Sequence, residues 1–175
     1  MSGVDNVLRE DADYNAVSGM NNVVGNNADK NVVGGNANYV GNNGYANAVF
    51  GNNNALLYQN YNNFVSGEGN QLGAYADQNI VGGRNNVLGE EADNNAVSGL
   101  NNDIGINADH NVVGGQGNQV GNESNRNLVT GQQNVVGNYA NSMPSAADRT
   151  RFRISATTTP SAGETTWLGS IRISI

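Results

Sequence analysis

Residues 3–142 repeat every 16 residues without an insertion, and this period constrains the fold more than any other feature of the chain. With Asn15 taken as position 1, the unit reads N-x-V-x-G-x-x-N-x-[VLI]-G-x-x-A-D-x in nine successive copies, the first of them partial. Helix-pair repeats need more than about 30 residues a unit. The period therefore predicts an all-β parallel β-solenoid (β-roll) of about nine 16-residue coils, in which identical positions stack about 4.8 Å apart.

The recurring residues each have a structural explanation in such a coil. Val at position 3 and the aliphatic residue at position 10 are predicted to point inward, and Asn at position 1 shares their face, where stacked amides can bond to their copies above and below. Gly at positions 5 and 11 is expected where φ is positive, and Asp at position 15 is expected to close an Asx-type turn. The predicted structural ladders include Asn15, Val17, Asn31, Val33, Asn79, Val81, Asn111 and Val113.

Position 2 is apolar in all eight complete copies and is predicted to point outward. Its larger members are the candidate subunit-interface residues Val32, Phe64, Ile80, Val112 and Leu128. Loops of the roll or the C-terminal segment are one candidate cover for this stripe. A subunit interface is the other, because a long exposed apolar strip is unusual on a monomer. Cyclic symmetry lets three identical stripes meet on one axis, which favours a homotrimer.

The composition changes after Asn141. Residues 143–175 contain no Asn but hold six of the seven Thr residues of the chain. Segments 151–155 and 171–175 alternate apolar and polar residues, which is typical of half-buried strands. The domains are therefore predicted to be a solenoid over 3–142 and a small β-strand cap or clasp over 143–175, which would cover the open end of the solenoid.

Charge and composition exclude several classes of protein. The net charge is -7, and no basic stripe with stacking aromatics is present, so we expect no nucleic-acid partner. No apolar run long enough to span a membrane and no signal peptide is evident, so membrane insertion is not expected. The chain has no Cys and a single His, His110, and we expect no catalytic residues, no metal and no cofactor. The Asp residues at position 15 suit a turn better than an ion site.

Aromatic residues interrupt the regular positions in the third to fifth coils. Tyr45, Phe50, Tyr58, Tyr61 and Tyr75 are the candidate ligand-contact residues. Core filling and subunit contacts are equally consistent with their positions, and these alternatives stay open.

The N-x-V-x-G unit over residues 3–142 resembles the head repeats of trimeric autotransporter adhesins and related repeats in bacteriophage fibres. It also resembles the half-repeats of grass ice-recrystallisation-inhibition proteins. Both resemblances imply a left-handed parallel β-roll. The first implies a trimer that binds host surfaces, and the second implies ice binding.

We therefore expect a non-enzymatic, extracellular structural or adhesive rod: a homotrimer on a cell surface or virion that presents a binding surface to a host glycan or protein. The alternative is an ice-binding solenoid. It is less favoured because position 2 mixes Ala48, Phe64 and Ile80 in consecutive coils, which would not make a flat face. A third hypothesis is a tailspike-like enzyme acting on carbohydrate.

Overall fold

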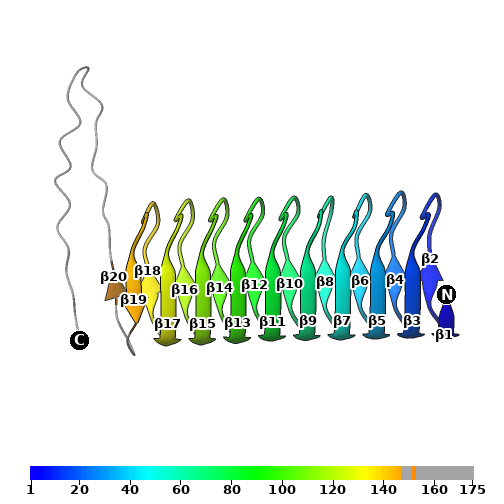
Figure 1. The fold of residues 1–175 in the computed structure, drawn as a ribbon, viewed down its shortest axis with the longest axis horizontal. Helices are drawn as coiled ribbons and strands as arrows, with labels where there is room; N and C mark the ends of the chain where they lie inside the picture. Colours follow the sequence, from blue (N-terminus) through cyan, green and yellow to red (C-terminus); the bar gives the residue numbers. More distant parts are fainter. Residues whose placement is uncertain (147–150, 153–175) are drawn as a thin grey trace, which may run out of the picture.

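The computed structural model describes residues 1–146 and 151–152 and confirms the predicted β-solenoid. Within these residues the chain forms strands and turns and no helix, and each coil contributes one longer and one shorter strand (Figure 1). The strands form two ten-stranded parallel sheets. We call the sheet of odd-numbered strands sheet A and the sheet of even-numbered strands sheet B.

The strand bounds follow the 16-residue period throughout. Sheet A consists of β1 (Ser2–Val4), β3 (Ala16–Met20), β5 (Val32–Asn36), β7 (Ala48–Asn52), β9 (Phe64–Glu68), β11 (Ile80–Arg84), β13 (Ala96–Leu100), β15 (Val112–Gln116), β17 (Leu128–Gln132) and β19 (Pro144–Ala146). Sheet B consists of β2 (Val7–Leu8), β4 (Val23–Val24), β6 (Tyr39–Val40), β8 (Ala55–Leu56), β10 (Gln71–Leu72), β12 (Val87–Leu88), β14 (Asp103–Ile104), β16 (Gln119–Val120), β18 (Val135–Val136) and β20 (Arg151–Phe152).

Adjacent strands pair in parallel with a register of one full repeat. Val33 lies beside Val49, and Val81 beside Val97, so each residue is aligned with the residue 16 places further along the chain. The coils consequently stack in a straight row, with the turns from each even strand to the next odd strand along one edge (Figure 1). We call these turns, positions 11–16 of the repeat, the third side of the coil.

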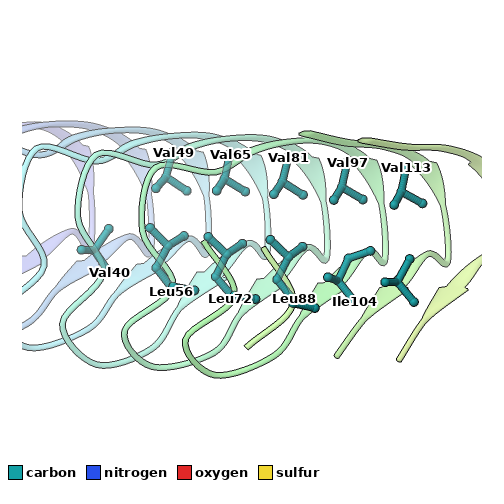
Figure 2. Packing of buried hydrophobic residues seen from close by; sticks show 14 of the residues in the cluster. Val40, Val49, Leu56, Val65, Leu72, Val81, Leu88, Val97, Ile104 and Val113 are labelled. Carbon is teal, nitrogen blue, oxygen red and sulfur yellow. The ribbon is translucent and has the colours of Figure 1, made fainter. Parts of the chain in front are cut away.

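The core is thin and consists of facing rows of aliphatic side chains. The position 3 valines of sheet A face the position 10 residues of sheet B, as Figure 2 shows for Val65 and Leu72. Buried alanines at position 14, such as Ala76 and Ala92, complete the core at the third side. Each coil buries only two aliphatic side chains and one small corner residue, so its stability depends strongly on the neighbouring coils.

The predicted C-terminal cap is only partly covered by the described residues. β19 and β20 fall within it, and they pair in parallel with β17 and β18 respectively, one coil further along both sheets. The expected strand segment 171–175 and the rest of the predicted cap lie outside the described residues.

The backbone corrects one expectation about the glycines. Position 5 does have positive φ, for example +111° at Gly35. Position 11 does not: a Cβ on Gly41 would lie 1.9 Å from the carbonyl oxygen of Leu57 in the next coil. Glycine is therefore present at position 11 because neighbouring coils approach closely there.

Positive φ also occurs at three positions that the sequence analysis did not identify. Positions 7, 13 and 16 are left-handed, as at Asn21 (φ 57°), Asn27 (φ 52°) and Lys30 (φ 58°). Asn is the non-glycine residue that tolerates this conformation best, which accounts for many of the asparagines outside the two ladders.

Candidate functional site

The asparagines at position 1 form a continuous hydrogen-bonded ladder inside the solenoid. Asn31 Nδ2 donates to Asn15 Oδ1 (3.1 Å) and to the carbonyl oxygen of Gly44 (2.9 Å). Asn31 Oδ1 in turn accepts from the backbone N–H and the Nδ2 of Asn47. Every donor and acceptor of the buried amide is thus used within the protein. The ladder residues named from the sequence are therefore structural, and they offer no group to a ligand.

The asparagines at position 8 form a second ladder, in which each side chain bonds to the amide of the adjacent coil and to backbone carbonyl oxygens of sheet A. Asn38 Nδ2 has three acceptors within 3.0 Å: Asn22 Oδ1 and the carbonyl oxygens of Gly34 and Gly51. Because Asn38 is buried, these bonds are protected from competing water. They connect adjacent coils through side chains as well as through the backbone.

Position 2 of sheet A forms an exposed apolar surface, which we call the apolar stripe. In the single chain the exposed fractions are 44% for Val32, 46% for Phe64, 61% for Ile80, 49% for Val112 and 47% for Leu128. The strands that carry them are in register, so these side chains and the intervening alanines lie in one row along the rod. From Val32 to Leu128 the row extends for about 29 Å.

The neighbouring outward position of sheet A is mostly small. Position 4 is Gly or Ser in six of the eight complete copies, for example Gly34, Ser66 and Gly82. Phe50 is the bulky exception, and its ring lies 6.2 Å from that of Phe64. A row of large apolar side chains beside a row of small ones has the shape that two copies of one surface need in order to interdigitate.

The five aromatic residues proposed as ligand contacts do not form one patch. Phe50 belongs to sheet A beside the apolar stripe. Tyr58 and Tyr75 form an edge-to-face pair on the third side, with ring centroids 5.6 Å apart. Tyr45 and Tyr61 line a separate open depression, also on the third side.

This depression, which we call the tyrosine hollow, has a volume of about 680 Å³ and spans three coils. It is lined by Asn27, Asn43, Tyr45, Gln59, Tyr61 and Asn62. The four amide residues were not identified from the sequence. The sequence feature that could have identified them is the absence of acidic residues at positions 12, 13 and 15 in the two turns that contain Tyr45 and Tyr61.

The aspartates at position 15 act between coils and do not form the expected Asx-type turns. Asp93 Oδ1 accepts the backbone N–H of Asp77 (2.7 Å), and Asp109 Oδ1 accepts that of Asp93 (2.8 Å). Asn125 serves Asp109 in the same way (2.6 Å), so the position needs an acceptor and not a charge. Partial burial raises the pKa of Asp77 and Asp93, although the backbone N–H bonds oppose this shift.

The remaining surfaces show little chemistry in the part of the chain that the structure describes. No group of three or more His, Asp or Glu side chains is arranged to hold a metal ion there. A shallow groove of about 370 Å³ follows the position 11 glycines past Gly89, Gly105 and Gly121. None of the described elements is a helix of the length and apolarity that crossing a bilayer requires.

The sequence matches no protein-family profile and no curated protein. Among solved structures, UDP-N-acetylglucosamine O-acyltransferase of Moraxella catarrhalis RH4 is 14% identical, with a TM-score of 0.31, over 84% of this chain and 68% of the enzyme. The polySia-specific acetyltransferase NeuO is 10% identical, with a TM-score of 0.25, over 90% of this chain and 92% of its own.

These comparisons contradict one expectation from the sequence. Both similar structures are enzymes by name. The expectation, drawn from the repeat, that the protein is non-enzymatic was therefore wrong and is withdrawn. Likenesses this weak assign no activity to the chain either.

Proposed function

We propose that the protein is a structural and adhesive rod that self-associates through its apolar stripe and presents its other faces to a surface glycan or protein. The observation that carries this proposal is the row of five half-exposed apolar side chains on consecutive or near-consecutive strands of sheet A. We propose a homotrimer on a cell surface or virion, as the resemblance to trimeric autotransporter adhesin heads and bacteriophage fibres implies.

Association through the apolar stripe is supported by its length and by its lack of polar residues. Within the solenoid, position 2 carries no polar residue, and burying the exposed half of a side chain such as Phe64 or Ile80 contributes about 1–1.5 kcal/mol. A coil with so thin a core gains substantially from such burial. The small residues of position 4 allow the backbones of two copies to approach closely.

The test is the oligomeric state in solution, measured by light scattering and sedimentation equilibrium on the full chain. We expect a trimer for the natural sequence and a shift to monomer for the double variant Phe64→Lys, Ile80→Lys. Val87→Lys is the matched control, because Val87 is 39% exposed but lies on β12 of sheet B. It should remain trimeric.

A natural chain that stays monomeric at all accessible concentrations would contradict the proposal. Inhibition of ice recrystallisation by that monomer would favour the alternative, an ice-binding solenoid like the grass proteins. The irregular sizes of Ala48, Phe64 and Ile80 argue against a flat ice-binding face on sheet A.

A further inference from the structure

Two adjacent coils depart from the repeat on the third side, in addition to the exception of Phe50 on sheet A. Within residues 42–62 the two Asn ladders and the aliphatic core positions 3 and 10 keep their usual residues, so both sheets continue through this region without a break. The departures on the third side affect three positions. They are Leu57 for Gly at position 11, Gly44 and Asn60 for Ala at position 14, and Tyr45 and Tyr61 for Asp at position 15.

The backbone of the third side also forms β-bridges at this point. Tyr45 pairs in parallel with Asp29 below and with Tyr61 above, and these are the isolated β-bridges among the described residues. The N–H of Asp29 donates to the carbonyl oxygen of Gly44 (2.9 Å), since Tyr45 supplies no side-chain acceptor. The two tyrosines are therefore held one coil apart, about 4.8 Å along the rod.

The side chains of the tyrosine hollow combine aromatic rings with amides. The Lys30 ammonium donates to the Tyr45 hydroxyl and lies 4.8 Å from the centre of its ring, which fixes the orientation of Tyr45. Gln59 Nε2 lies 3.5 Å from the Tyr61 hydroxyl. Among the described residues, the exposed side-chain amides of Asn27 and Asn62 have no protein partner, so they remain able to bond to a ligand.

The hollow lies in an interval without carboxylates on an otherwise acidic surface. Ten of the thirteen acidic residues within 1–142 lie on the third side of the coils, but none of these lies between Asp29 and Asp77. The carboxylates of Asp29 and Asp77 border the hollow at its two ends. An anionic ligand would therefore meet a carboxylate at either end of the hollow, and the single ammonium that the described residues place nearby, that of Lys30, is already engaged with Tyr45.

We propose that the tyrosine hollow binds a neutral oligosaccharide that lies along the rod. A sugar ring has an apolar C–H face that stacks on a tyrosine ring, and its hydroxyl groups bond to amides such as those of Asn27 and Asn62. Three coils span about 10 Å, a length that accommodates two sugar units. The lining is entirely tyrosine and amide, so it offers no apolar pocket for a peptide side chain.

This inference deepens the proposed adhesive function and rests on it. The hollow lies on the third side and the apolar stripe on sheet A, so association through the stripe leaves the hollow open. A trimer would carry three such sites, and weak binding at each would combine into a stronger attachment to a surface.

The test measures binding of the full chain to immobilised neutral hexasaccharides of glucose, mannose, galactose and N-acetylglucosamine, with polygalacturonate and sialyllactose as anionic probes. The double variant Tyr45→Asp, Tyr61→Asp restores the usual residue at position 15, where Asp accepts the N–H of the preceding coil, so it should keep its fold. Tyr139→Asp is the control, because Tyr139 is 52% exposed but lies outside the hollow.

We expect the natural chain and Tyr139→Asp to bind at least one neutral hexasaccharide. The double variant should bind it about tenfold more weakly, or not at all. The inference is overturned if no neutral probe binds, if an anionic probe binds better, or if the double variant binds as well as the natural chain. Light scattering on the same samples separates the two proposals. A trimer without glycan binding overturns this inference alone, and a monomer that binds glycan supports it while overturning the proposed assembly.

Discussion

At the scale of single residues, the buried asparagines take the place of the large aliphatic side chains that a thicker core would contain. Each amide at positions 1 and 8 bonds to its copies in adjacent coils and to backbone carbonyl oxygens, as Asn31 and Asn38 show. Removal of one rung leaves donors and acceptors without partners on both sides of it, and the low local dielectric makes that loss costly.

Asn79→Ala is therefore expected to lower the free energy of unfolding by roughly 3 kcal/mol. Asn79 Nδ2 donates to Asn63 Oδ1 and to the carbonyl oxygen of Ala92, and its Oδ1 accepts from Asn95. Urea unfolding followed by circular dichroism measures the change. Asn36→Ala is the control, since the Asn36 amide is exposed and makes one bond at the surface. Equal losses in the two variants would contradict the importance of the ladder.

Adjacent glycines provide a second prediction at this scale. A Cβ on Gly83 would lie 2.0 Å from the carbonyl oxygen of Gly99, and φ at Gly83 is +106°. Gly82 has ordinary φ, and the nearest atom to a Cβ there is Ser66 Oγ at 3.6 Å. We expect Gly83→Ala to destabilise the fold by roughly 3 kcal/mol or more and Gly82→Ala to change it little. Thermal unfolding of both variants decides this, and similar melting temperatures would argue against the close approach of the coils.

At the scale of elements, the strands of the two sheets are nearly uniform and the turns of the third side carry the variation. Position 15 illustrates this difference, because Asp, Asn and Tyr all occur there. Asp and Asn use a side-chain oxygen to accept the N–H of the preceding coil, whereas Tyr45 and Tyr61 are accompanied by extra backbone bridges. The charge of the aspartates is thus unnecessary for the turn.

The pKa of Asp93 gives a pH-dependent prediction about this turn. Burial raises its pKa above the ordinary value of 3.8, and the charge of Asp109 adds to the effect. The folded state then binds the proton more tightly than the unfolded state, so the ionised carboxylate costs stability at neutral pH, and the cost disappears as the pH falls below the ordinary pKa.

Asp93→Asn keeps the acceptor oxygen and removes the charge. It should raise the free energy of unfolding at pH 7 by no more than about 1 kcal/mol, because the side chain is still partly solvated. The gain should vanish below about pH 3. Chemical denaturation at the two pH values measures it, and a loss of stability at pH 7 would show that the carboxylate charge is needed.

The sheets were predictable from the sequence because the 16-residue period fixes which residues stack. Val33 beside Val49 and the inward row of Leu56, Leu72 and Leu88 follow directly from that period. The reason for glycine at position 11 was not predictable, since it depends on a close approach between coils at Gly41 and Leu57 that no local pattern reveals. The sequence analysis also grouped Phe50 with Tyr45, whereas position 4 lies on sheet A and position 15 lies on the third side of the coil.

At the scale of the whole molecule, the rod is a stack of equivalent coils in which each contacts only its neighbours. Removal of residues 79–94 joins Gln78 to Asn95 and leaves every ladder in register, whereas removal of residues 79–86 places Val87 where the Asn ladder should continue. We expect the first deletion to retain the β-sheet circular dichroism spectrum and cooperative unfolding, and the second to lose both. A folded product from the eight-residue deletion would contradict the strict register.

The replacement of Ala by Gly44 and Asn60 at position 14 also has a consequence for how the chain folds. A Cβ on Gly44 would lie 2.7 Å from Val40 Cγ1, and the larger Asn60 stacks directly above that glycine. If one coil looped out, the buried Asn60 would lie over the methyl group of Ala28 instead of over Gly44. Most coils are interchangeable, so misaligned stacking is the natural error of such a chain. These two residues distinguish one alignment of the coils from the others, which the ladder and core positions alone do not.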